Sequence, residues 1–151
     1  MELTVYSDEH FMLEALKQAQ IAFEEGEVPV GAIVVCQNKI IARAYNQTER
    51  LNDVTAHAEM LAITSAANFL GGKYLRDCTL YVTLEPCGMC AGALQWSQLS
   101  KLVFAQEDVH RGYREINPAM IHPKTEVNFG LHAAASKKLL ETFFDKLRTE
   151  K

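Results

Sequence analysis

Two short clusters in this chain have the residue types and spacing of metal ligands. The first is His57 with Glu59 two positions later, and the second is Cys87 with Cys90 three positions later, directly after Pro86. One imidazole and two thiolates can hold a zinc ion and leave one of its four positions open for water. Glu59 is not needed as a ligand, so it can move protons beside that water. The pattern predicts a hydrolytic site with one zinc ion per chain.

Each cluster has a simpler interpretation when it is taken alone. A His-x-Glu pair is common at a solvated helix start, and a Cys-x-x-Cys pair can be a redox couple or half of a structural zinc site. The order H-x-E followed by P-C-x-x-C is, however, the signature of zinc-dependent nucleobase deaminases. A redox pair has no use for the upstream His57 and Glu59. The combination therefore favours the catalytic interpretation.

The residues around the cysteines predict how they are positioned. The run from Thr79 to Leu84 is typical of a buried strand, and Pro86 suits a turn before a helix from Gly88 to Gln98. Residues three apart in a first helical turn are neighbours, and the positive end of a helix favours thiolates. We therefore expect Cys87 and Cys90 to face one ion.

A second helix must begin near the histidine. Side chains two apart point to nearly opposite sides in mid-helix, so His57 and Glu59 can share one cavity only at a helix N-terminus. A helix from His57 to Leu70 is therefore expected, in which Leu61, Ala62, Ser65, Ala66 and Phe69 recur at spacings of three and four.

The rest of the chain alternates helical and extended patterns. Ser7 is suited to cap the first helix, whose expected apolar stripe comprises Met12, Ala15, Leu16, Ala19, Ala22 and Phe23. The expected elements are a helix over 8–25, a hairpin of strands 31–35 and 40–45 turning at 37–39, strands at 102–104 and 126–129, and a helix over 133–148 with Leu139, Leu140, Phe143, Phe144 and Leu147 apolar. Strand 79–84, its helix and strand 102–104 form a βαβ crossover. The pattern predicts an α/β fold with a five-stranded mixed sheet between helical layers.

Length and composition are typical of a small cytoplasmic enzyme. The chain has 151 residues and is 48% hydrophobic, so residues 1–151 are expected to form a single domain. Its first residues lack the pattern of a signal peptide, and no apolar run approaches the roughly 20 residues that span a membrane. Cys36 and Cys78 are expected to be free, buried and structural, because a disulfide framework does not suit this context.

Charge is distributed unevenly along the chain. The net charge is −4, but residues 1–30 hold seven acidic groups against Lys17 alone. From residue 31 onward there are twelve acidic and fourteen basic groups, a net charge of +2. Local charge matters more than the total for a nucleic-acid partner. The candidate phosphate contacts are Arg111, Arg114, Lys124, Lys137, Lys138, Lys146 and Arg148.

Beyond these motifs, almost the whole chain, from about Phe11 to Arg148, resembles the cytidine/deoxycytidylate-type deaminases, and within them the bacterial tRNA-specific adenosine deaminases. The resemblance is carried by the blocks Gly26–Ala32, Thr55–Glu59, Leu80–Cys87, Met89–Ala93 and Leu140–Arg148, together with Asn46. It implies a three-layer α/β/α cytidine deaminase-like fold, zinc on His57, Cys87 and Cys90, and Glu59 as the proton shuttle.

The resemblance also implies a reaction and a set of contacts. The reaction is conversion of adenosine to inosine at the wobble position of the tRNA anticodon loop, by water attack at C6 of adenine. Asn46 is expected to contact the purine edge, and Val30, Ala56 and Glu85 to line its pocket. The family implies a homodimer whose partner completes the site. Tyr74 and Trp96 are candidates for that interface, although a core position is favoured for Trp96, the only tryptophan.

The match weakens between Asp108 and His122. Residues 109–118 read VHRGYREINP, where the family has a Thr-Gly-Ala-Ala-Gly-like stretch. This loop borders the substrate in the family, so substrate choice is the property that its sequence leaves open. One alternative is a deaminase of free guanine or cytosine. Another is a catalytically silent zinc subunit that recognises tRNA, against which the unligated Glu59 argues.

Overall fold

The computed structural model describes residues 6–150. In chain order its elements are α1 (Asp8–Glu24), β1 (Gly31–Cys36), β2 (Lys39–Tyr45), α2 (Ala58–Leu70), β3 (Cys78–Leu84), α3 (Gly88–Ser97), β4 (Lys101–Gln106), α4 (Tyr113–Ile116), a 3₁₀ turn (Pro118–Met120), β5 (Glu126–Phe129) and α5 (Ala133–Thr149). The sheet order is β2-β1-β3-β4-β5. Strands β2, β1 and β3 pair antiparallel, and β3, β4 and β5 pair parallel. The predicted five-stranded mixed sheet is confirmed.

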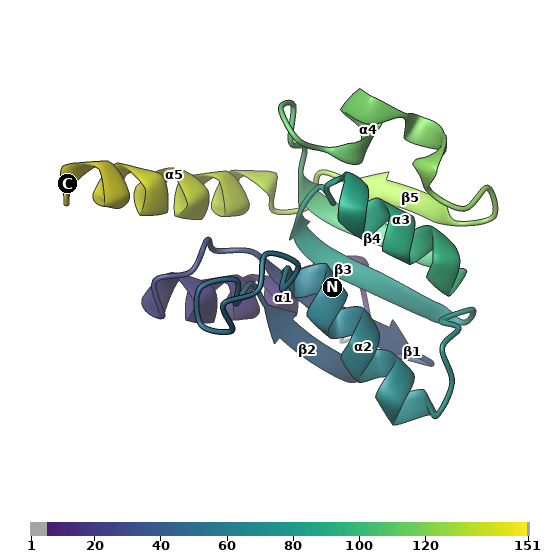
Figure 1. The fold of residues 1–151 in the computed structure, drawn as a ribbon. Coiled ribbons are helices and arrows are strands. Elements are labelled where there is room, and N and C mark those ends of the chain that lie inside the picture. The colour runs from purple at the N-terminus through teal and green to yellow at the C-terminus, as the bar shows by residue number, and fades with distance from the viewer. Residues whose placement is uncertain (1–5, 151) are drawn as a thin grey trace, which may run out of the picture.

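Helices cover both faces of this sheet, and alternate residues of each strand face opposite layers. Ile33, Tyr81 and Val103 pack with α1 on one face. Leu80 and Phe104 pack with α2 and α3 in the larger cluster on the other face. Helix α5 begins beside the sheet and extends beyond its end (Figure 1). The arrangement brings the first turns of α2 and α3 together at one end of the sheet.

Local signals explain where several elements begin and end. The Ser7 side chain accepts a hydrogen bond from the His10 backbone N–H at 3.1 Å, which is the predicted cap of α1. The hairpin turns in two residues, Gln37 and Asn38, rather than the expected three, and both have positive φ (52° and 64°). Two consecutive left-handed residues are typical of the tight turns that match the twist of a hairpin. Helix α4 and the 3₁₀ turn were not anticipated.

Helices α2 and α3 leave large aromatic side chains exposed. Helix α2 faces the sheet with small residues, Ala58, Ala62 and Ala66, while Ser65 is exposed and Phe69 is 69% exposed. Alanines at intervals of four let the helix lie close to the strands, and the wider side chains are left outside. Trp96 is 81% exposed, so its expected core position is wrong.

The remaining cysteines behave as expected for structural residues. Cys36 and Cys78 are opposite each other on β1 and β3, and both are free. Cys78 is buried and Cys36 is partly buried.

None of the helices in the described part of the chain is long and apolar enough to cross a membrane. The expectation that no signal peptide is present concerns in part residues 1–5, which lie outside the described residues.

Candidate functional site

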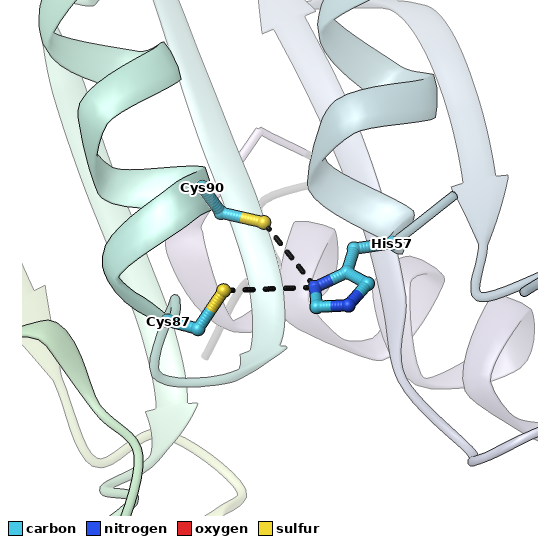
Figure 2. A group of neighbouring side chains, drawn as sticks. All are labelled: His57, Cys87 and Cys90. Carbon is cyan, nitrogen blue, oxygen red and sulfur yellow. Dashed lines mark hydrogen bonds between the residues drawn. The ribbon is translucent and has the colours of Figure 1, made fainter. Parts of the chain in front are cut away.

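The predicted metal ligands converge at the starts of two helices. Nδ1 of His57 lies 3.6 Å from Sγ of Cys87 and 3.5 Å from Sγ of Cys90. All three ligand atoms lie within 4.8 Å of one another. Figure 2 shows the imidazole at the start of α2 facing both thiols on the first turn of α3. Residues 30 positions apart in the chain therefore form one compact donor group.

The spacing of these atoms fits a tetrahedral ion. Bonds of about 2.1 Å to nitrogen and 2.3 Å to sulfur at the tetrahedral angle place the two atoms about 3.6 Å apart. The two N···S distances of 3.6 and 3.5 Å match that value. Three donors leave the fourth position of zinc open, as catalytic sites do. The donor set therefore fits a catalytic zinc ion.

The local backbone explains why both side chains are available as ligands. His57 and Cys87 occupy the N-cap positions of α2 and α3, and neither side chain makes a capping hydrogen bond. Both have extended backbone angles, with φ of −72° and −73°. Cap residues stand outside the helical spiral, so their side chains can turn toward a neighbouring helix. The predicted helix starts thus place the histidine opposite the cysteines.

The three ligand groups perturb one another. A hydrogen bond from Cys90, followed by the contact with His57, lowers the pKa of Cys87 to about 4. The same hydrogen bond and burial raise the pKa of Cys90, and the bond with Cys87 raises that of His57. One thiolate thus holds protons on both neighbours. A cation that replaces these protons would be bound by the same negative charge.

Glu59 lies deep beside this group. Its side chain projects from the first turn of α2, the residue is 4% exposed, and it lines the same cavity as His57 and Cys87. Burial raises the pKa of its carboxyl to about 7, and the negative charge near Cys87 adds to the effect. A carboxyl that both binds and releases a proton near neutral pH is suited to general acid–base chemistry.

A cavity of about 790 Å³ opens next to these residues. Of the four predicted substrate contacts, Val30 and Asn46 line it, whereas Ala56 and Glu85 do not. Ala56 is 1% exposed and is covered by its neighbours. The Nδ2 of Asn46 donates to the Val28 carbonyl at 3.4 Å, while its buried Oδ1 has no hydrogen-bond partner among residues 6–150. An unpaired buried acceptor is costly unless a ligand donates to it.

Several residues that line the cavity were not expected from the sequence. They lie at the ends of β3 and β4, in the loop after β4, on α2 and α5, and in the segments before β1 and after β2, and comprise Val28, Thr48, Ala58, Leu84, Gln106, Glu107, Asp108, Val109, His110, Leu140 and Phe144. The departure of residues 109–118 from the family pattern pointed to this loop. Leu140 and Phe144 had been expected only as core residues of their helix. Their place in the cavity wall depends on how α5 packs.

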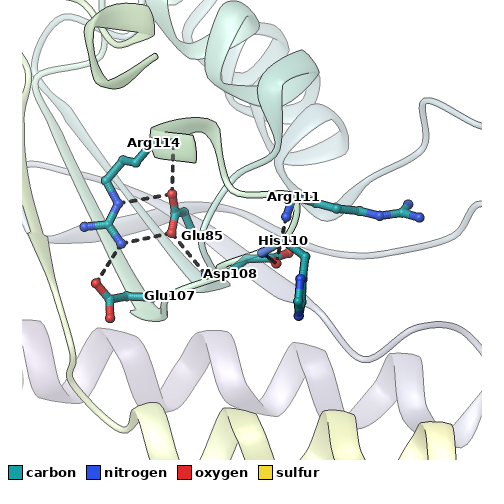
Figure 3. A network of polar contacts seen from close by, with 6 residues as sticks. All are labelled: Glu85, Glu107, Asp108, His110, Arg111 and Arg114. Carbon is teal, nitrogen blue, oxygen red and sulfur yellow. Dashed lines mark hydrogen bonds and ion pairs between the residues drawn. The ribbon is translucent and has the colours of Figure 1, made fainter. Parts of the chain in front are cut away.

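The predicted phosphate contacts differ in their surroundings. Arg111 is exposed and lines the cavity. Lys124, Lys137, Lys138, Lys146 and Arg148 are exposed, and Arg148 pairs with Asp145. Arg114 is already occupied, because its guanidinium pairs with Glu85 and with Glu107, at 2.9 Å in each case. Figure 3 shows the Arg114 guanidinium facing these carboxylates, while Arg111 points away from them.

Comparison with known proteins agrees with this geometry. The family model of the cytidine and deoxycytidylate deaminase zinc-binding region matches residues 5–106. The chain is 47% identical over 146 residues to the tRNA-specific adenosine deaminase of Aquifex aeolicus, covering 93% of this chain and 95% of that one.

Solved structures give the same result. One from a study of A-to-I editing by tRNA deaminases at the wobble position of transfer RNA has a TM-score of 0.81 and 41% identity, with 87% of this chain and 99% of that chain covered. The guanine deaminase of Bacillus subtilis has a TM-score of 0.66 and 35% identity, with 78% and 82% covered. The matched region contains the imidazole, both thiols and Glu59, so this chain belongs to the cytidine and deoxycytidylate deaminase zinc-binding family.

Proposed function

We propose that this chain is a zinc-dependent hydrolase that deaminates adenosine to inosine at the wobble position of tRNA. The observation that carries the proposal is the group of His57, Cys87 and Cys90 within 4.8 Å, with buried Glu59 lining the same cavity. The similarity to tRNA-specific adenosine deaminases over nearly the whole chain supports the choice of substrate. One zinc ion per chain, held by these three residues, is part of the proposal.

When bound, zinc supplies a Lewis acid that lowers the pKa of a water molecule in its open position. Two thiolates neutralise much of the charge of the ion, so a nearby base matters more than at an all-histidine site. Glu59 has the required position because it lines the cavity beside the ligands and is shielded from bulk water. Its carboxylate takes a proton from the attacking water, delivers it to N1 of adenine, and then transfers a proton to the departing amino nitrogen.

The cavity supports binding of a flipped purine base. Val28, Val30 and Leu84 give it apolar walls for the flat faces of a base. No group in the described part of the chain donates a hydrogen bond to the side-chain oxygen of Asn46. This oxygen can therefore accept a hydrogen bond from the base. Taking a nucleotide out of its stack and into such a pocket is how enzymes reach a base atom. We propose Asn46 and Val30 as substrate contacts.

The test is deamination of an anticodon stem-loop with adenosine at the wobble position by the purified zinc form. Inosine is expected at that position only, and Glu59→Gln is expected to lose at least about 100-fold in rate while keeping its zinc, because proton transfer is worth roughly 10²–10⁴. Glu24→Gln, at the exposed end of α1, is the control and should leave the rate unchanged. Near-normal turnover by Glu59→Gln with zinc bound would contradict the proton-transfer role.

A second candidate is a deaminase of a free base. It is supported by the similarity to a guanine deaminase at 35% identity and by the distinct residues 109–118. Guanine and cytosine are therefore supplied in parallel reactions. Ammonia from a free base, with no inosine in the stem-loop, would select this candidate. Zinc binding with no activity on any substrate would instead select the silent tRNA-recognition subunit.

A homodimer is part of the same proposal. Exposed Phe69 and Trp96 lie on α2 and α3, which cover one face of the sheet, and aromatic side chains are enriched at interfaces. We expect a homodimer there, which Trp96→Glu should convert to a monomer in sedimentation velocity while Trp96→Phe should not. An unchanged dimer in Trp96→Glu would place the interface elsewhere.

A single cooperative unfolding transition is expected if residues 1–151 form a single domain.

Four exposed cationic residues, Arg111, Lys124, Lys146 and Arg148, are proposed to contact the tRNA anticodon loop. Arg111 lies at the cavity, and Lys146 and Arg148 lie on the last turn of α5, whose Phe144 lines the same cavity. Removal of one phosphate contact reduces the salt dependence of binding by roughly one charge. Each contact is tested by measuring how the affinity for the stem-loop changes with salt concentration in Arg111→Ala, Lys124→Ala, Lys146→Ala and Arg148→Ala. A variant with an unchanged salt dependence rejects its contact.

We also propose a cytoplasmic location, which cell fractionation tests.

A further inference from the structure

All the acceptor positions of the Glu85 carboxylate, directly after β3, are taken by hydrogen bonds. Its side chain is 2% exposed, and it belongs to the link between β3 and the metal-ligand turn. Its two oxygens accept four N–H groups, from the backbone of Asp108 and of Arg114 and from Nε and Nη2 of Arg114, at 2.9–3.1 Å. A carboxylate has about four acceptor sites. Glu85 therefore has none left for a substrate.

Several contacts hold the side chain of Arg114 in place. Besides its two side-chain bonds to Glu85, its guanidinium donates to Glu107 at 2.9 Å. The same planar group lies over the rings of Phe129 and Phe104, at 4.4 and 5.0 Å from their centroids. Only an arginine side chain combines a two-pronged carboxylate contact with stacking on aromatic faces. The charge of Arg114 is thus used inside the protein.

These contacts close a ring of backbone around Glu85. The two N–H groups it binds are those of Asp108 and Arg114, the two ends of the loop that borders the cavity. Gly112 packs directly on the carboxyl group, and a Cβ there would overlap it. The Gly112 N–H also donates to the Asp108 carbonyl at 2.9 Å. The loop is wrapped around one buried anion (Figure 3).

The ring connects the cavity wall to the metal ligands. Gly112 forms an isolated backbone bridge with Cys87, and the Tyr113 N–H donates to the Pro86 carbonyl at 2.9 Å. At the tip of the loop, the Asp108 side chain accepts the N–H groups of His110 and Arg111. His110 and Arg111 line the cavity. Their position relative to the ligands therefore depends on the Glu85–Arg114 pair.

We propose that Arg114 is a positioning residue that holds the 108–111 wall over the cavity and thereby sets the affinity for the substrate. The inference rests on the proposed function, since the substrate is the RNA whose nucleotides meet that wall. Arg114 contacts neither the cavity nor the reacting atoms, because it is absent from the cavity lining. Its loss should therefore weaken substrate binding more than the chemical step.

Steady-state kinetics on the wobble-adenosine stem-loop test this proposal. Arg114→Ala is expected to raise KM about tenfold or more, with kcat within about twofold of the unchanged chain and zinc content unaltered. Arg114→Lys keeps the charge but loses the fork and the stack, so its KM should fall between the two. Arg43→Ala is the matched control, because Arg43 lies on the edge strand β2 and its half-exposed side chain makes an ion pair with Glu14 on α1. Its kinetics should not change.

Hydrogen exchange gives a readout that does not depend on catalysis. Peptides covering residues 108–114 should exchange about tenfold faster in Arg114→Ala, whereas those covering α2 should be unchanged. An unchanged KM in both Arg114 variants overturns the proposal, as does a loss confined to kcat. If Arg114→Ala does not fold, Arg114→Lys alone decides by the same criteria. Failure of the unchanged chain to deaminate the stem-loop rejects the proposed function instead, and the exchange rates still report on the ring.

Discussion

At the scale of single residues, two of the three proposed zinc ligands occupy helix N-cap positions without capping the helix. Ser, Thr, Asp or Asn at such positions usually contributes about 0.5–2 kcal/mol through a hydrogen bond to the first turn. His57 and Cys87 occupy these positions without making that bond. Their side chains are turned toward each other instead. The two helix starts therefore lack the stabilisation of a capping hydrogen bond, and zinc binding would offset that loss.

Removal of one thiol tests the ligand set. Cys90→Ser is expected to weaken zinc binding by at least about 100-fold, since even the loss of a group supporting a ligand costs 10–100-fold. Competition with a coloured chelator measures the affinity. Cys36→Ser, on the β1–β3 pair away from the site, should bind zinc as the unchanged chain does. Equal affinity in all three proteins would show that Cys90 is not a ligand.

At the scale of elements, the position of β1 is set by a glycine. A Cβ on Gly31 would overlap the backbone of α1 at Ala15 and Ala19, so the helix and the strand approach more closely than other residues allow. The backbone of Val30, directly before Gly31, accepts the N–H of Asn46 at 3.0 Å. Both of these side chains line the cavity. The packing of α1 on β1 therefore also places one wall of the site.

Gly31→Ala should destabilise the fold by about 1–3 kcal/mol, the usual cost of forcing an extra methyl group into a packed core. Urea unfolding measures it. Gly72→Ala is the control, because a Cβ there meets nothing within 4 Å and its φ is not positive. The control should stay within about 0.5 kcal/mol of the unchanged chain. Equal stability of the two variants would contradict the close approach of α1.

At the scale of the whole molecule, a partly buried charge network joins the first helix to two strands of the sheet. The Asp8 carboxylate accepts hydrogen bonds from Tyr81 on β3 at 2.6 Å and from Lys101 on β4 at 2.9 Å. Burial raises the pKa of Asp8, but these two partners outweigh burial, and the net result is a pKa below the ordinary 3.8. The acidic first helix is thus tied to the sheet by an interaction that depends on pH.

The sign of this dependence follows from the lowered pKa. The folded chain binds this proton more weakly than the unfolded chain, so the stabilisation is complete above pH 3.8 and is lost as the pH falls through the folded value. Asp8→Asn should be less stable at pH 7 by on the order of 1 kcal/mol, after allowance for screening by water. The difference should vanish in acid. Thermal unfolding of both proteins between pH 7 and 3 measures it, with Glu24→Gln as control, and a constant difference would contradict the assignment.

Several features of the molecule were determined by the sequence alone because they depend on short-range patterns. The strand before Pro86, the helix starts at His57 and Cys87 and the cap at Ser7 each follow from residues within a few positions of one another. The H-x-E and P-C-x-x-C clusters predicted the ligand residues in the same way, whereas the contact between His57 and the cysteines, about 30 positions away, comes from the fold. The sheet followed from alternating elements, since few topologies satisfy short connections.

Tertiary structure decided which groups are used up and which are free. Arg111 and Arg114 look equivalent in the sequence, yet one lies exposed at the cavity and the other is held by Glu85, Glu107 and two rings. Trp96 is apolar but exposed, because α2 and α3 meet the sheet through smaller residues. Local patterns carry no information about partners brought from distant positions. The depth of Glu59, the open acceptor of Asn46 and the wall formed by residues 108–111 are therefore properties of the folded chain, since each depends on contacts that only folding creates.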